Sequence, residues 1–129
     1  MTSPHAPSKT VAPPTGLALV LETSIAGIPY YDFHDGRMPV DAGMPVKVVR
    51  EAANDYDANA IAIYTPAGAK LGYIPRRKNP LLARLMDAGW PLSGRVERVE
   101  TPHPGLGDPR HSARRASIDI SIFVPRYEA

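Results

Sequence analysis

The sequence of 129 residues contains no cysteine. This absence excludes disulfide bonds, thiolate zinc sites and cysteine nucleophiles, so the stability of the fold must come from its core. Long apolar runs are absent as well, which predicts neither a signal peptide nor a membrane-spanning helix. The length is typical of one domain. We therefore expect a single-domain cytoplasmic protein that does not associate with a membrane.

The usual catalytic and metal-binding motifs are also missing. No two of the four histidines have the i, i+4 spacing of a metal-binding helix. Asp55, Asp57 and Asn59 resemble the first half of a calcium loop, but Ala60 replaces the turn glycine and Pro66 the bidentate glutamate. There is no nucleophile elbow, phosphate-binding loop or dinucleotide fingerprint. We predict a non-enzymatic protein with no metal site and no cofactor.

Charge is unevenly distributed along the chain. Residues 1–69 contain 4 Lys/Arg and 7 Asp/Glu, whereas residues 70–129 contain 11 Lys/Arg and 6 Asp/Glu, for a net charge of +2. A basic half suits a polyanion such as nucleic acid, although arginines scattered over a surface give the same count.

The residue pattern divides the chain into a leader and one domain. Residues 1–16 are rich in proline and poor in apolar residues, which predicts disorder, and residues 17–127 form the predicted domain. Alternating apolar and polar residues predict strands at 17–25, 44–50, 60–66, 69–74, 94–100 and 116–124. This order lacks a strand–helix–strand repeat. This order predicts a mainly β fold, a small antiparallel barrel with one main helix.

Local signals add detail to this prediction. Val46, Val48 and Arg50 should share one face of their strand, and residues 66–68 should form a hairpin turn. Residues 101–115 form a long loop that we expect to be mobile. The helix should begin with Asn79 as its N-cap and Pro80 in its first turn, and should end at Gly89. Its apolar face would pack on the sheet through Leu81, Leu82, Leu85 and Met86.

Tyrosines, polar residues and cations gather near the predicted turns. The candidate binding residues are Tyr30, Tyr31, Asn54, Tyr56, Asp57, Tyr73, Arg76, Arg77 and Lys78. Aromatic faces beside cations suit single-stranded nucleic acid, because bases stack on rings while phosphates pair with Arg and Lys. Structural roles remain open. The tyrosines would then cover a small core, the cations would be solvated, and Asp57 would fold its own turn.

Three segments together resemble the HIRAN domain, over about residues 20–124. The segments are the Tyr30-Tyr31 pair, the run from Arg50 to Ile61, and the run from Leu71 to Arg76. The resemblance implies an OB-like barrel of six strands with short helices. For the eukaryotic relatives it also implies capture of the 3′ end of single-stranded DNA.

The resemblance assigns roles to individual residues. Tyr56 matches a ring that stacks on the terminal base, and Asp57 a carboxylate that accepts a hydrogen bond from the 3′ hydroxyl. Tyr30 and Asn54 match further contacts to the strand. Tyr73 falls where relatives carry histidine. Arg76 falls near the position of a lysine that contacts phosphate in the relatives. Pro29 departs from the pattern, because it replaces an arginine that grips phosphate.

The leading hypothesis is a binding module for single-stranded DNA that prefers a free 3′ end and acts in DNA repair or replication. The alternative is a protein-interaction domain that recruits a nuclease or a helicase through an exposed strand edge or the proline-rich leader.

Overall fold

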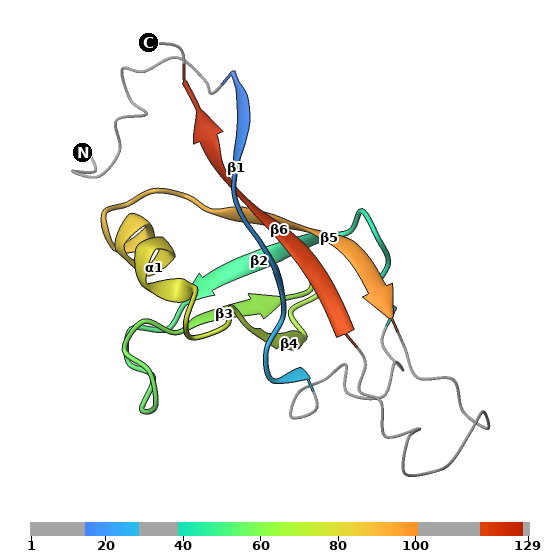
Figure 1. The fold of residues 1–129 in the computed structure, drawn as a ribbon, viewed down its shortest axis with the longest axis horizontal. Coiled ribbons are helices and arrows are strands. Elements are labelled where there is room, and N and C mark those ends of the chain that lie inside the picture. Colours follow the sequence, from blue (N-terminus) through green and yellow to red (C-terminus); the bar gives the residue numbers. More distant parts are fainter. Residues whose placement is uncertain (1–14, 29–38, 101–116, 128–129) are drawn as a thin grey trace.

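The computed structural model describes residues 15–28, 39–100 and 117–127 (Figure 1). The elements are β1 (Gly16–Ser24), β2 (Pro45–Arg50), β3 (Ile61–Tyr64), β4 (Lys70–Tyr73), α1 (Asn79–Asp87), β5 (Ser93–Glu100) and β6 (Ser117–Arg126). Each predicted strand is present, with ends close to the predicted ones. The leader over residues 1–14 and the loop over residues 101–115 lie outside the described residues. No helix in the described ranges is long and apolar enough to cross a membrane.

The six strands form one antiparallel sheet in the order β1-β6-β5-β2-β3-β4. The mainly β prediction is therefore confirmed. The sheet does not close completely, so it is a barrel only in the loose sense. Its two edges meet at one bridge after the end of β1, where Ala26 N donates to Tyr73 O (2.8 Å) and Tyr73 N donates to Ala26 O (2.9 Å).

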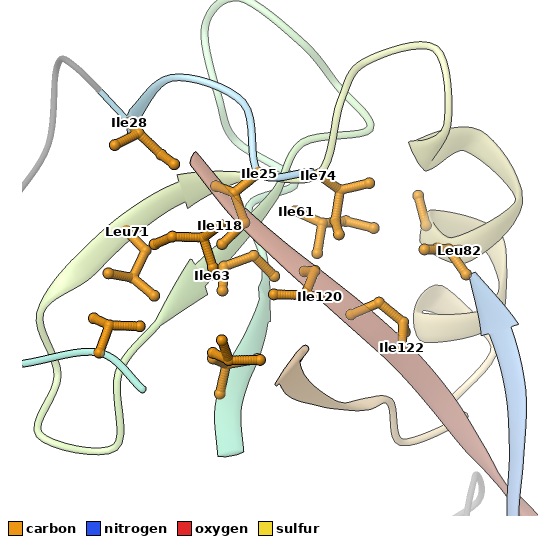
Figure 2. Packing of buried hydrophobic residues seen from close by; sticks show 14 residues of the cluster. Ile25, Ile28, Ile61, Ile63, Leu71, Ile74, Leu82, Ile118, Ile120 and Ile122 are labelled. Carbon is orange, nitrogen blue, oxygen red and sulfur yellow. The ribbon is translucent and has the colours of Figure 1, made fainter. Parts of the chain in front are cut away.

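Apolar and polar side chains alternate along the strands, and the apolar ones form the core (Figure 2). On β6, Ile118, Ile120 and Ile122 are fully buried, and they meet Ile61, Ile63 and Leu71 from β3 and β4. On β2, Val46 is buried and Val48 and Arg50 are half-buried, while Lys47 and Val49 are exposed. This confirms the predicted faces of that strand.

The predicted hairpin turn between β3 and β4 is also present, with Gly68 at a φ of 96° and Thr65 N donating to Ala69 O (2.9 Å).

The start of α1 differs from the sequence prediction. Lys78 is the N-cap and makes no side-chain capping bond, whereas Asn79 is the first helical residue and is buried. The prediction of Asn79 as N-cap is therefore wrong, because its side chain instead contacts a neighbouring loop. The apolar face also differs: Leu82 is buried at 2% exposure, but Leu81 is 65% exposed. Leu85 and Met86 are half-buried against the core as expected.

Candidate nucleic-acid interface

The loop between β2 and β3 folds through its own polar side chains. Its ends are joined where Glu51 N donates to Ala60 O (2.9 Å). Inside the loop, Asn54 Oδ1 accepts hydrogen bonds from the main-chain N–H groups of Tyr56 (2.8 Å) and Asp57 (3.0 Å). Asp57 Oδ1 accepts one from Asn59 N (2.9 Å). The short polar side chains thus hold the turn, as Asx residues commonly do.

This loop forms one wall of a pocket of about 360 Å³. The opposite wall comes from the end of β4 and the segment that follows it. Five of the predicted binding residues line the pocket together with Ala26, Ala60 and Ile74: Asn54, Tyr56, Asp57, Tyr73 and Arg76. Tyr56 is 86% exposed, so its ring is available to a planar ligand.

The three successive cations do not share one surface. Arg76 lines the pocket, and its Nε lies 4.0 Å from Asp57 Oδ2. Arg77 is exposed and does not line this pocket. Lys78 turns towards β1, where its Nζ donates to Thr23 Oγ1 (3.3 Å), and it lines a different pocket. The remaining predicted residues, Tyr30 and Tyr31, lie outside the described residues.

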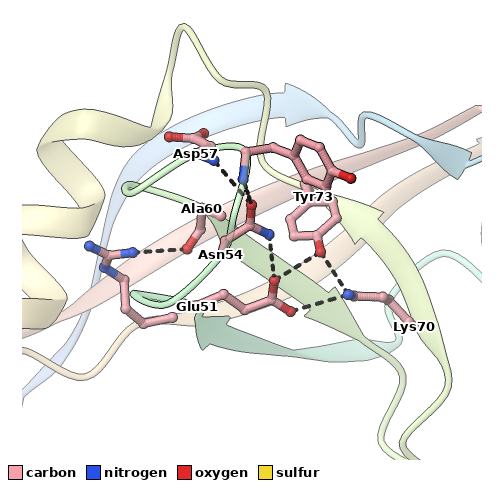
Figure 3. Close-up of polar contacts among 8 residues, drawn as sticks. Glu51, Asn54, Asp57, Ala60, Lys70 and Tyr73 are labelled. Atoms are coloured by element: carbon pink, nitrogen blue, oxygen red, sulfur yellow. Dashed lines mark hydrogen bonds and ion pairs between the residues drawn. The ribbon is translucent and has the colours of Figure 1, made fainter.

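A hydrogen-bonded network under the pocket holds Tyr73 and Asn54 (Figure 3). Tyr73 Oη accepts from Lys70 Nζ (2.7 Å) and donates to Glu51 Oε1 (2.8 Å). Glu51 Oε2 pairs with Lys70 Nζ at 3.1 Å, and Asn54 Nδ2 donates to Glu51 Oε1 (3.0 Å). The Tyr73 hydroxyl is therefore engaged within the protein.

Sequence reasoning did not select Glu51 or Lys70. Lys70 lies in β4 and Glu51 directly follows β2, so strand pairing has to bring them together. The one available signal was the position of Glu51 inside the run that resembles the HIRAN domain.

Asp57 is also held from the helix. Asn79 Nδ2 donates to Asp57 Oδ2 (2.8 Å), although the two residues are 22 positions apart. The hydrogen bond from Asn59 N, and next that from Asn79, hold the pKa of Asp57 below its ordinary value against the opposing effect of burial. The positive charges of Arg76 and Arg50 act in the same direction. Asp57 is therefore an ionised carboxylate at neutral pH.

Arg50 joins the loop to the far end of the helix. Its Nη1 donates to Ala60 O (3.1 Å), and its Nε and Nη2 bind the two carboxylate oxygens of Asp87 at 3.0 and 3.2 Å. A planar guanidinium suits this paired contact. In the described part of the chain, no group of three or more His, Asp or Glu residues is placed to hold a metal ion.

Acid should destabilise the domain in part through Glu51. Burial raises the pKa of Glu51, but hydrogen bonds from Asn54, Tyr73 and Lys70 outweigh it, so the pKa lies below its ordinary value of 4.5. A lowered folded-state pKa means that this stabilisation is present above the ordinary value and is lost as the pH falls through the folded-state pKa. Thermal denaturation midpoints should therefore fall over that range, and they should fall less in Glu51→Gln.

The matched control is Glu22→Gln, which removes an exposed glutamate of β1. Its midpoints should follow the wild-type pH dependence. Equal acid sensitivity of Glu51→Gln and the wild type would contradict this account of the network.

Comparison with known proteins gives a consistent set of matches. The chain matches the HIRAN domain over residues 19–124. The crystal structure of the HIRAN domain of human HLTF aligns with a TM-score of 0.63 and 22% identity, covering 88% of this chain and 82% of that one. A crystal structure of a protein from Lactobacillus plantarum aligns with a TM-score of 0.57 and 27% identity, covering 83% and 96%.

The NMR structure of the HLTF HIRAN domain in its DNA-bound conformation aligns with a TM-score of 0.51 and 21% identity, covering 83% of this chain and 78% of that one. No curated protein matches the sequence.

Proposed function

Because this chain belongs to the HIRAN domain family, we propose that it is a binding module for single-stranded DNA that prefers a free 3′ end. One observation carries the proposal: a single pocket gathers an exposed ring, an ionised carboxylate and a guanidinium, from Tyr56, Asp57 and Arg76. The DNA-bound conformation recorded for the HLTF domain supports nucleic acid as the ligand.

Each of the three groups suits a different part of a strand end. Tyr56 offers a face on which the terminal base stacks. Asp57 accepts a hydrogen bond from the 3′ hydroxyl, because each of its oxygens keeps a lone pair after bonding to Asn59 and Asn79. Arg76, whose side chain is 76% exposed, is available to a phosphate.

The other candidate residues take supporting roles in this proposal. Asn54 shapes the loop and the ring of Tyr73 forms part of the pocket wall, because the polar groups of both are engaged within the protein. Arg77 extends the positive charge beside Arg76 for phosphates further along the strand. Lys78, Tyr30 and Tyr31 remain predicted contacts.

We assign the domain a binding role and no reaction of its own. Such a module acts inside the cell and holds a strand end for a partner enzyme, such as a helicase or a nuclease.

Removing Arg76, which lines the pocket, together with its exposed neighbour Arg77 should weaken binding and flatten its dependence on salt. For single strands, each lost phosphate contact lowers the slope of log affinity against log salt by roughly 0.7, so Arg76→Ala with Arg77→Ala should lower it by about 1.4. The measurement is fluorescence polarisation with a labelled oligothymidine across a salt series.

The control double variant is Arg84→Ala with Arg126→Ala, which removes two exposed cations elsewhere on the fold. It removes the same amount of positive charge as the Arg76 and Arg77 variant. Its slope should differ from the wild-type slope by less than about 0.7, the value of one phosphate contact. A pocket variant with an unchanged slope, or a control with an equal loss, would remove this patch from the binding site.

A further inference from the structure

Asn79 is an unusual residue for the place that it occupies. It is 1% exposed at the start of α1, and its Oδ1 has no hydrogen-bond partner among the described residues. A buried acceptor without a partner costs stability, and asparagine is a poor helix former. Its side-chain amide donates a hydrogen bond from Nδ2 to Asp57 Oδ2 (2.8 Å). The contact with Asp57 is therefore the feature that explains an asparagine here.

We propose that Asn79 is a positioning residue of the pocket, whose amide orients the Asp57 carboxylate towards the end of a bound strand. This inference rests on the proposed function, since it concerns how the same carboxylate meets its ligand.

The geometry around Asp57 shows what Asn79 adds. Asn59 N holds Oδ1 from inside the loop, while Asn79 holds Oδ2 from the helix. Two hydrogen bonds to different oxygens fix the plane of the carboxylate, which a bond to one oxygen leaves free to rotate. Arg76 lies on the same side as Oδ2, at 4.0 Å. Without Asn79 only the hydrogen bond from Asn59 N holds the carboxylate, whose second oxygen is then free to rotate away from the ligand.

Asn79→Leu separates a positioning role from a structural one. Leucine has nearly the shape of asparagine, is a better helix former and needs no hydrogen-bond partner. These gains offset the lost hydrogen bond to Asp57, so the melting temperature should change little. The preference for a 3′-hydroxyl over a 3′-phosphate oligothymidine should fall about fivefold to tenfold, because one hydrogen bond that orders a charged group is lost.

A second readout needs no DNA. The pKa of the Asp57 carboxyl, followed by NMR titration, should rise in Asn79→Leu, while the hydrogen bond from Asn59 and the charges of Arg76 and Arg50 remain. A helix that is merely destabilised would not produce this change. The control is Leu85→Ala, which removes packing from the same helix. It should lower the melting temperature and leave both the end preference and this pKa unchanged.

The outcomes separate the two claims. A wild-type protein that binds both ends equally contradicts the proposed function and, with it, a role of Asn79 in reading the end. A wild-type preference that persists in Asn79→Leu overturns the positioning role alone. An unchanged pKa of Asp57 in Asn79→Leu overturns the underlying contact.

Discussion

Asp57→Asn should abolish the preference for a 3′ hydroxyl over a 3′ phosphate, a loss of about tenfold to hundredfold in relative affinity. The estimate follows from one charge-assisted hydrogen bond, worth about 1.5–3 kcal/mol. The carboxylate also repels a terminal phosphate, and the neutral amide does not. Polarisation binding with the two oligonucleotides measures the effect.

The fold should survive this substitution. The new side-chain oxygen can still accept from Asn59 N, and Asn79 can rotate its amide so that its unpartnered Oδ1 accepts from the new amide. Asp55→Asn is the control, because it removes an equal charge from an exposed position of the same loop. If Asp55→Asn lowers the preference as much as Asp57→Asn does, general charge and not end reading explains the selectivity.

Gly72→Ala should lower the free energy of unfolding by about 2–4 kcal/mol, through the combined cost of backbone strain and overpacking. Gly72 has a φ of 152°, and a Cβ atom there would collide with the main-chain oxygen of Ala26 and lie 2.6 Å from Ile25 Cγ2. The oxygen belongs to the bridge that joins the two edges of the sheet, next to the pocket. Urea denaturation followed by circular dichroism measures the loss.

Gly68→Ala is the matched control for this prediction. Its φ of 96° is also positive, but nothing lies within 4 Å of an added Cβ. It should therefore cost only the strain of the backbone, about 1 kcal/mol. Equal losses in the two variants would show that the contact with Ala26 does not matter.

The strands were predictable because their signal is local. Alternation of apolar residues predicted the strand at β6 and placed Val46 and Val48 of β2 on the correct face. The helix was harder. Asparagine is common at N-caps, so the sequence predicted Asn79 as the N-cap of the helix. In the structure its side chain instead donates a hydrogen bond to Asp57, 22 residues away. Sequence periodicity likewise put Leu81 on the buried face, although the apolar side chains that the helix buries are Leu82 and Ala83.

The candidate site was predictable in part. The resemblance to a known domain selected Tyr56, Asp57 and Arg76, which the fold brings into one pocket. Adjacency in sequence was a poor guide for Lys78, because the turn before α1 directs it to another face. Nothing in the local sequence marks Lys70 or Asn79 as part of the site, because their contacts there form only after distant segments have packed together.

The most direct test of the central claim is a polarisation titration of the wild-type protein with three labelled oligothymidines of equal length. One has a free 3′ hydroxyl, one a 3′ phosphate, and one a blocked 3′ end with a free 5′ hydroxyl. The account predicts that the free 3′ hydroxyl binds most tightly, by about tenfold or more. Equal affinity for the three strands would contradict it.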